Sequence, residues 1–124
     1  MEEPQSLDNE TTEEVIALFK ALAEPNRLRI FSDLLQGDSC NCELRDRLGL
    51  PPNLLSHHLR VLSKAGLVNS RRDTIDGRWI YYSIDLETLA RWQSWFNRFL
   101  DPAHIQERMV CGPEGQQGIQ ITGP

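Results

Sequence analysis

The 124-residue sequence lacks the features that mark several large classes of protein. It has no run of about 18 apolar residues, so no segment is expected to cross a membrane. Its N-terminus is acidic and lacks the basic and then apolar pattern of a signal peptide. The cysteines number only three, and this odd count favours free thiols in a reducing cytoplasm over a disulfide framework. The length suits a single domain.

An excess of positive charge is also missing from the chain as a whole, whose formal net charge is −5. The charges are unevenly distributed, however. Residues 45–78 hold seven basic and three acidic side chains, whereas residues 1–44 hold three basic and ten acidic ones. Contact with phosphate groups requires a local basic surface rather than a basic total. The central segment is therefore a candidate nucleic-acid interface, although charge alone also fits an ordinary solvated surface.

The stretch from residue 40 to residue 64 predicts two helices joined by a short turn at residues 49–52. The second helix begins near Asn53, and its apolar residues have the spacing of one buried helical face. These residues are Leu55, Leu59 and Leu62. The opposite face presents groups that can hydrogen-bond base edges and pair with phosphates. The residues that we expect to contact DNA there are Asn53, Ser56, His57, Arg60 and Lys64.

A β-hairpin is predicted directly after these helices. Residues 67–72 and 78–84 form its two strands, and Asp76-Gly77 is a signal for the turn between them. Three arginines gather towards its tip, where we expect them to touch a minor groove or phosphates: Arg71, Arg72 and Arg78. A plain two-stranded ribbon would not explain this arrangement.

Further helices are predicted on both sides, which gives a mainly α protein with one small hairpin. The first starts at Thr11 or Thr12, and its apolar stripe consists of Val15, Leu18, Phe19 and Leu22. The second runs from Pro25 to about Leu35, and its inward residues are Leu28, Phe31 and Leu35. We therefore predict a disordered arm at residues 1–10, a folded domain at residues 11–101 and an irregular tail at residues 102–124.

The last helix runs from a cap at Asp85 to about Leu100 and carries more apolar side chains than a small monomer can cover on one helical face. They are Leu86, Leu89, Trp92, Trp95, Phe96 and Phe99. We therefore expect the first and last helices to form the interface of a homodimer, because large exposed apolar patches mark association surfaces.

Three motifs and the hairpin carry a resemblance to a known family. The motifs are Cys40-Asn41-Cys42-Glu43-Leu44, Ser56-His57-His58-Leu59-Arg60-Val61-Leu62 and Ala65-Gly66-Leu67-Val68, followed by the pattern from Arg72 to Tyr82. Together they resemble the ArsR/SmtB family of metal- and metalloid-responsive winged helix-turn-helix repressors, over roughly residues 12–100. The resemblance implies a dimer that binds double-stranded operator DNA, matches an inverted repeat, and releases it when an inducer binds.

The cysteines form a candidate site for a thiophilic ion, with Cys40 and Cys42 as a pair and Cys111 as the third ligand. Inside a helix the pair would point about 200° apart, so Cys40 must lie outside the helix or the first turn must be distorted. The helix N-terminus is expected to lower the thiol pKa. The familiar arsenic-repressor pattern has another cysteine three residues after the second, but this sequence has Arg45 there.

Three thiolates suit As(III) or Sb(III), which take three sulfurs in a pyramid, and Cd(II) and Pb(II) are thiophilic alternatives. Zinc usually takes four ligands. The zinc-sensing branch of the family uses Asp-x-His and His-x-x-Glu pairs on the last helix, and this last helix has none. A zinc sensor is therefore not expected, and no cofactor beyond the inducing ion is required.

Other interpretations of these residues remain open. A thiol redox sensor of the same fold would join Cys111 to Cys40 or Cys42 by a disulfide. A cysteine oxidoreductase or arsenate reductase would need a nucleophile loop in a βαβ setting, which the sequence does not show, so we do not expect an enzyme. His57 and His58 could suggest a metal pair. Adjacent residues face different directions on a helix, however, so we interpret His57 as a DNA contact and His58 as packing.

Overall fold

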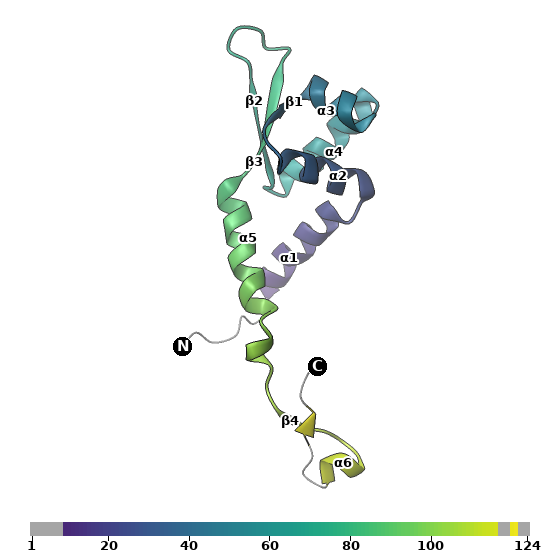
Figure 1. The fold of residues 1–124 in the computed structure, drawn as a ribbon, viewed down its shortest axis with the longest axis vertical. Coiled ribbons are helices and arrows are strands. Elements are labelled where there is room, and N and C mark those ends of the chain that lie inside the picture. The colour runs from purple at the N-terminus through teal and green to yellow at the C-terminus, as the bar shows by residue number, and fades with distance from the viewer. Residues whose placement is uncertain (1–8, 117–119, 122–124) are drawn as a thin grey trace. The chain divides into compact units, whose positions relative to one another are not determined.

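The structure is a computed structural model that describes residues 9–116 and 120–121, and it divides into two compact units at residue 91 (Figure 1). The first unit contains, in order, α1 (Asn9–Leu22), α2 (Pro25–Leu34), β1 (Ser39–Cys40), α3 (Asn41–Leu48), α4 (Pro52–Lys64), β2 (Val68–Arg72), β3 (Ile80–Ile84) and the start of α5 (Leu86–Phe99). The second contains the rest of α5, the short helix η1 (Pro102–His104), β4 (Arg108–Met109), α6 (Pro113–Gln116) and β5 (Gln120–Ile121). Within the described ranges, no helix is long and apolar enough to cross a membrane.

Local capping interactions decide where the helices of the first unit begin and end. The carboxylate of Glu24 accepts a hydrogen bond from the backbone N–H of Arg27 at 2.8 Å and so caps α2. Asp85 does the same for α5 through the N–H of Thr88, at 2.9 Å, as the sequence predicts. Gly49 ends α3 in the left-handed conformation with φ 65°, which favours a residue without a side chain.

The sheet has three strands in the order β1-β3-β2, all antiparallel to their neighbours. Figure 1 shows β2 and β3 extending as a hairpin away from the helices, with β1 beside α3. The register places Cys40 opposite Tyr81 on one side of β3 and Arg71 opposite Tyr81 on the other. The predicted ribbon therefore gains a third strand, which is only two residues long and too short to leave a repeating pattern in the sequence.

The core of the first unit lies where α2, α3 and α4 meet. The side chains of Ile30, Leu44, Leu59 and Leu62 are at most 2% exposed. Leu55 is 3% exposed, so the apolar stripe predicted for residues 53–64 is confirmed.

Two details of the predicted helices are wrong. Thr11 and Thr12 lie inside α1 rather than at its cap, because the chain is already helical at Asn9. In α2 the residues that face inward are Ile30 and Leu34. The sequence predicted Leu28 and Leu35 to face inward, but they are 54% and 50% exposed.

The error in α2 has a tertiary cause. Its sequence offers two overlapping apolar stripes at helical spacing, and contacts with α3, α4 and β3 select the stripe of Ile30 and Leu34. Leu28 instead lines an open hollow with Pro25 and Leu48.

The two tryptophans of α5 are largely covered. Trp92 and Trp95 are 7% and 6% exposed, and the ring of Trp95 stacks on that of Phe99 with centroids 4.5 Å apart. Their cover comes from the chain itself, so the dimer interface expected from the sequence would use the apolar side chains of α1 and α5 that stay exposed. On α1 these are Ile16 and Phe19, which are 46% and 52% exposed, and on α5 they are Leu86 and Phe99, which are 74% and 40% exposed.

The adjacent residues Leu34 and Leu35, at the C-terminal end of α2 and its cap, test which face of this helix is buried. Leu34 is 2% exposed and Leu35 is 50% exposed. Leu34→Ala should lower the free energy of unfolding by about 2–5 kcal/mol, because it removes packed apolar volume and leaves a cavity. Leu35→Ala should cost less than about 1 kcal/mol, as substitutions on a surface usually do. Urea unfolding followed by circular dichroism measures both, and equal losses would contradict the assigned core face.

Candidate nucleic-acid interface and thiol site

The polar face of α4 is exposed along its whole length. The five residues predicted there all have exposed side chains: Asn53, Ser56, His57, Arg60 and Lys64. The other face of α4 packs into the core through its leucines, so the helix is held rigidly while its polar groups point to solvent. The structure thus gathers these five side chains on one surface, and their contact with DNA remains a prediction.

His58 lies on the inner side of α4 and is 5% exposed. Its Nδ1 atom is 3.2 Å from the Nη1 atom of Arg27, and its Nε2 atom is 3.6 Å from a carboxylate oxygen of Glu24. Because an arginine can only donate, Nδ1 accepts and the proton resides on Nε2, facing the carboxylate. Burial lowers the pKa of His58; Glu24 raises it, and Arg27 and His57 lower it further. A neutral, packed histidine fits the interpretation made from the sequence.

Arg27 extends this contact to a third helix. Its Nε–H donates to the backbone carbonyl of Ala21 at 2.7 Å, and its Nη2 donates to that of Lys20 at 3.3 Å. These carbonyls belong to the last turn of α1, where the helix itself supplies no donors. One guanidinium therefore joins the end of α1, the start of α2 and the inner face of α4.

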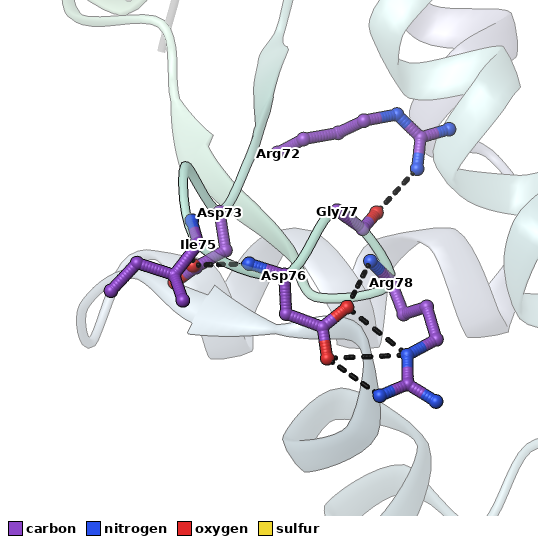
Figure 2. A network of polar contacts seen from close by, with 6 residues as sticks. All are labelled: Arg72, Asp73, Ile75, Asp76, Gly77 and Arg78. Atoms are coloured by element: carbon purple, nitrogen blue, oxygen red, sulfur yellow. Dashed lines mark hydrogen bonds and ion pairs between the residues drawn. The ribbon is translucent and has the colours of Figure 1, made fainter.

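Two aspartates organise the loop between β2 and β3 (Figure 2). A carboxylate oxygen of Asp73 accepts hydrogen bonds from the backbone N–H groups of Ile75 and Asp76, at 2.8 and 3.0 Å. The carboxylate of Asp76 accepts from the guanidinium of Arg78, with Nη2–Oδ2 at 2.7 Å and Nε–Oδ1 at 3.0 Å. The connection is thus a structured loop over residues 73–79, closed by the N–H of Asp73 on the carbonyl of Trp79, rather than the two-residue turn that Asp76-Gly77 suggests.

The arginines of the hairpin are held in different ways. The guanidinium of Arg71 lies 4.5 Å from the ring centroid of Tyr81, in a cation–π contact. The hydroxyl of Tyr81 donates to Asp73 at 2.8 Å, and the Nη1 of Arg72 donates to the carbonyl of Gly77 at 2.6 Å. Arg78 keeps 89% of its side chain exposed despite its ion pair. Sequence reasoning missed the part played by Asp73, which only the observed loop geometry reveals.

Cys40 is the residue that caps α3. Its backbone is extended, with φ −79° and ψ 162°, and its Sγ atom accepts a hydrogen bond from the N–H of Glu43 at 3.4 Å. The carboxylate of Glu43 accepts in return from the N–H of Cys40 at 3.2 Å, which completes a capping box. Cys40 therefore lies outside the regular helix, which is one of the two conditions under which it and Cys42 could bind a single ion.

The expected lowering of the thiol pKa is wrong for Cys40. Its side chain is 3% exposed, and this burial raises its pKa more than the N–H of Glu43 lowers it. The reason is that a buried thiolate loses its hydration, which outweighs one hydrogen bond at a helix start. At neutral pH Cys40 is therefore expected to be a protonated, buried thiol.

The three cysteines differ in their surroundings. Cys42 is half-buried in the first turn of α3, and Cys111 is exposed and belongs to the second unit of the chain. Among the residues that the structure describes, no group of three metal-ligating side chains is gathered at one place. The three-cysteine site thus remains a prediction.

An ion-pair network centred on Arg47 surrounds the junction between β1 and α3, where Cys40 lies. The guanidinium of Arg47 binds Asp33 of α2 at 2.8 and 3.0 Å, donates to the hydroxyl of Ser39, and lies 3.8 Å from Glu43. This single arginine thus joins α2, β1 and the start of α3. Its engagement means that not every basic residue of the segment 45–78 is available for phosphate.

Comparison with known proteins identifies the family to which the chain belongs. The family model of bacterial regulatory proteins of the arsR family matches residues 24–70. An uncharacterised helix-turn-helix transcriptional regulator of Methanocaldococcus jannaschii is 40% identical over 76 residues, which are 60% of this chain and 82% of the relative. A homologue of the cadmium resistance regulatory protein CadC from Staphylococcus aureus is 32% identical over 99 residues, which cover 79% of this chain and 74% of that one. The chain belongs to the ArsR family.

A solved structure agrees with this assignment. It is the homodimeric winged helix-turn-helix DNA-binding domain of a possible ArsR-family transcriptional regulator from Mycobacterium bovis. The sequences are 29% identical, the match covers 79% of this chain and 90% of the other, and the TM-score is 0.59. The predicted mainly α fold with a small antiparallel hairpin is therefore confirmed as the winged helix of ArsR-family transcriptional regulators.

The buried histidine of this ArsR-family chain predicts a dependence of stability on pH. Because the pKa of His58 is lowered in the folded state from its usual value of 6.5, the unfolded chain takes up a proton first as the pH falls. The free energy of unfolding should therefore be highest above that value and should fall as the pH drops through it. His58→Gln should flatten this decrease, whereas His57→Gln, at an exposed position, should retain it. Denaturant unfolding at pH 7.5 and 5.5 measures the difference, and equal slopes for the two variants would contradict it.

Proposed function

We propose that this chain is a transcriptional repressor that binds an inverted-repeat operator as a homodimer in the cytoplasm. In this proposal it dissociates when As(III) or Sb(III) binds a site formed by Cys40, Cys42 and Cys111. The observation that carries the proposal is the pairing of a polar, exposed reading face on α4 with an arginine-bearing hairpin in a winged helix. An enzymatic function has no comparable support, since the relatives named above are transcriptional regulators.

The DNA contacts follow from the chemistry of the two exposed surfaces. Asn53, Ser56 and His57 can donate to or accept from base edges in a major groove, and Arg60 and Lys64 can pair with phosphates. Arg71, Arg72 and Arg78 of the hairpin would extend the contact along the duplex. The ordered loop at residues 73–79 supports this role, because a preformed surface loses less conformational entropy on binding.

Dimerisation is supported by the exposed apolar residues Ile16 and Phe19 of α1. The similar domain from Mycobacterium bovis is described as homodimeric. In the proposed dimer α1 and α5 of two chains pack against each other, and the two reading helices match a two-fold symmetric operator.

The position of Cys40 supplies a physical link between an inducer and the DNA-binding helices. The Sγ atom that would bind the ion is the atom that accepts the N–H of Glu43 and caps α3. Ion binding would change the direction and strength of this hydrogen bond, and complete loss of a cap typically costs about 0.5–2 kcal/mol of helix stability. The first turn of α3, which holds Cys42, would then adjust, and α3 lies directly before the turn into α4.

The metal specificity has an alternative. Three sulfur ligands with no carboxylate or imidazole suit As(III) or Sb(III), and Cys111 could come from the same chain or from the partner. The similarity to a regulator named for cadmium resistance favours Cd(II) or Pb(II) as the second possibility. A redox response through a disulfide to the exposed Cys111 is the remaining variant of this proposal.

Operator binding tests the DNA interface. Ser56→Ala, Arg60→Ala and Arg78→Ala should each weaken affinity. The two arginine variants should also reduce the dependence of log affinity on log salt concentration, by about 0.9 for each phosphate that the arginine neutralises. Fluorescence anisotropy with a labelled operator, repeated at several salt concentrations, measures both quantities and the number of chains bound. Unchanged affinity and salt dependence in all three variants would contradict the proposed interface.

Substitution of the thiols tests the sensing site. Cys40→Ser should fold and bind operator normally, because serine is itself a good helix cap, but it should not release DNA on addition of arsenite. Cys42→Ser should behave in the same way, and Cys111→Ser should bind the ion more weakly and release DNA less completely.

The size of the response follows from linkage. Ion and DNA should weaken each other's binding by the same factor, ordinarily about 5- to 150-fold. The measurement is operator affinity with and without arsenite, with Cd(II) and a thiol oxidant as parallel additions. If Cys111→Ser responds like the wild type, the tail supplies no ligand, and if all three variants do, the thiol site is not the sensor.

A further inference from the structure

A small cavity lies between α3, α4 and β3, beside the face of α4 that is proposed to read DNA. Its volume is about 80 Å³, which is room for a group of a few heavy atoms. Its lining consists of Asn41, Arg45, Pro52, Leu55, Ser56, Leu59, Ile80 and Tyr82. Ser56 belongs both to this lining and to the exposed polar face of α4, so the cavity opens at the edge of that face.

The polar groups of the cavity are mainly hydrogen-bond donors. The Oδ1 atom of Asn41 accepts from the N–H of Ile80 at 3.5 Å, which leaves the two N–H groups of its amide as the groups it can offer. Burial raises the pKa of Tyr82, so its hydroxyl stays protonated and can donate. Arg45 contributes a guanidinium whose side chain is 44% exposed, and its contact with Asp46 is long, at 3.6 Å.

The cavity is also suited in charge to an anion. Among the described residues that line it, none is acidic and one is an arginine. Asn41 and Arg45 are four residues apart on α3 and so share one face of that helix. Their two side chains can therefore approach the same group from one side while Ser56 approaches it from α4.

We propose that this cavity seats one phosphodiester group of the operator backbone, with Asn41, Arg45 and Ser56 as its donors. The inference rests on the proposed repressor function and adds a contact made by α3, which neither the polar face of α4 nor the hairpin provides. A phosphate held between α3, α4 and β3 fixes the depth at which α4 enters the groove, because contacts to the backbone set the register of a protein on the duplex.

The proposed phosphate site lies beside the thiol pair, because Cys40 caps α3 and Cys42 lies in its first turn. Asn41 stands between Cys40 and Cys42 in the sequence, and Arg45 occupies the position at which the resembling arsenic-repressor pattern has its further cysteine. An ion that displaces the cap at Cys40 would therefore move the turn that carries Asn41. The same short helix would then bear both the group that binds the inducer and the group that holds DNA.

Neutral phosphate analogues test the seat one linkage at a time. Each phosphodiester of the operator is replaced in turn by a methylphosphonate, and affinity is measured for the wild type, for Arg45→Gln and for Arg29→Gln. Arg29 is a matched control, because it is an exposed arginine whose guanidinium donates to the carbonyl of Leu48 at 3.1 Å, away from this cavity. Asn41→Asp is a second variant that keeps the acceptor for the N–H of Ile80 but brings a negative charge to the seat.

The expected result is one linkage in each half-site whose neutralisation weakens the wild type and Arg29→Gln on the order of tenfold, as charge-assisted hydrogen bonds do. The same neutralisation should not weaken Arg45→Gln further, and it should partly restore binding by Asn41→Asp. The salt dependence of the Arg45→Gln dimer should fall by about two, with roughly 0.9 for each phosphate.

The proposal is overturned if Arg45→Gln is sensitive to the same set of linkages as the wild type, or if Arg29→Gln becomes insensitive to the same linkage as Arg45→Gln. A wild type that does not bind operator at all would overturn the repressor proposal and this one together. That outcome is recognisable because no linkage then matters for any variant.

Discussion

The hydrogen bonds around Cys40 are the constraint on which the arrangement of the winged unit depends. Its backbone lies in β1, in register with Tyr81 of β3, and its side chain caps α3 through Glu43. The sheet and α3 therefore meet at one residue. Arg47 braces the same point by joining Asp33, Ser39 and Glu43. A change at this residue would therefore affect both the hairpin, through β3, and the start of α3.

The burial of Cys40 gives a sensor at this point a particular character. A thiol that is 3% exposed, with its pKa raised by burial, is expected to react slowly with general oxidants and alkylating agents, because the thiolate is the reactive form. Exposing and deprotonating the Cys40 thiol costs free energy. An ion that binds several thiolates at once can offset this cost, whereas a reagent that forms one weak bond to Cys40 cannot. In the proposed function this requirement favours a thiophilic ion that binds several thiolates over chemical modification of Cys40 alone.

Acidic residues determine how the basic groups of this chain are presented. Asp73 orders the hairpin loop, Asp76 holds Arg78, and Asp33 binds Arg47 into the body of the unit. Within the part of the chain that the structure describes, Arg45 and Arg60 are not held by a short ion pair, and both are exposed next to α4 or on it. The negative total charge of the chain is compatible with a local basic surface, because ten of the 18 acidic residues lie in residues 1–44 and only three lie in residues 45–78.

The sequence by itself determined the order of the helices and the hairpin of the winged unit, since helical spacing at Leu55, Leu59 and Leu62 and caps such as Asp85 are local signals. It also carried the family resemblance and placed the five polar residues of α4 on one face. Only the tertiary structure decided which stripe of α2 is buried, because both stripes are apolar and contacts with α3, α4 and β3 choose between them. The strand at Ser39 and Cys40, the buried state of the Cys40 thiol and the cavity beside Arg45 were likewise decided there. Each of these depends on segments that are distant in the sequence, and no local pattern of residues encodes their approach.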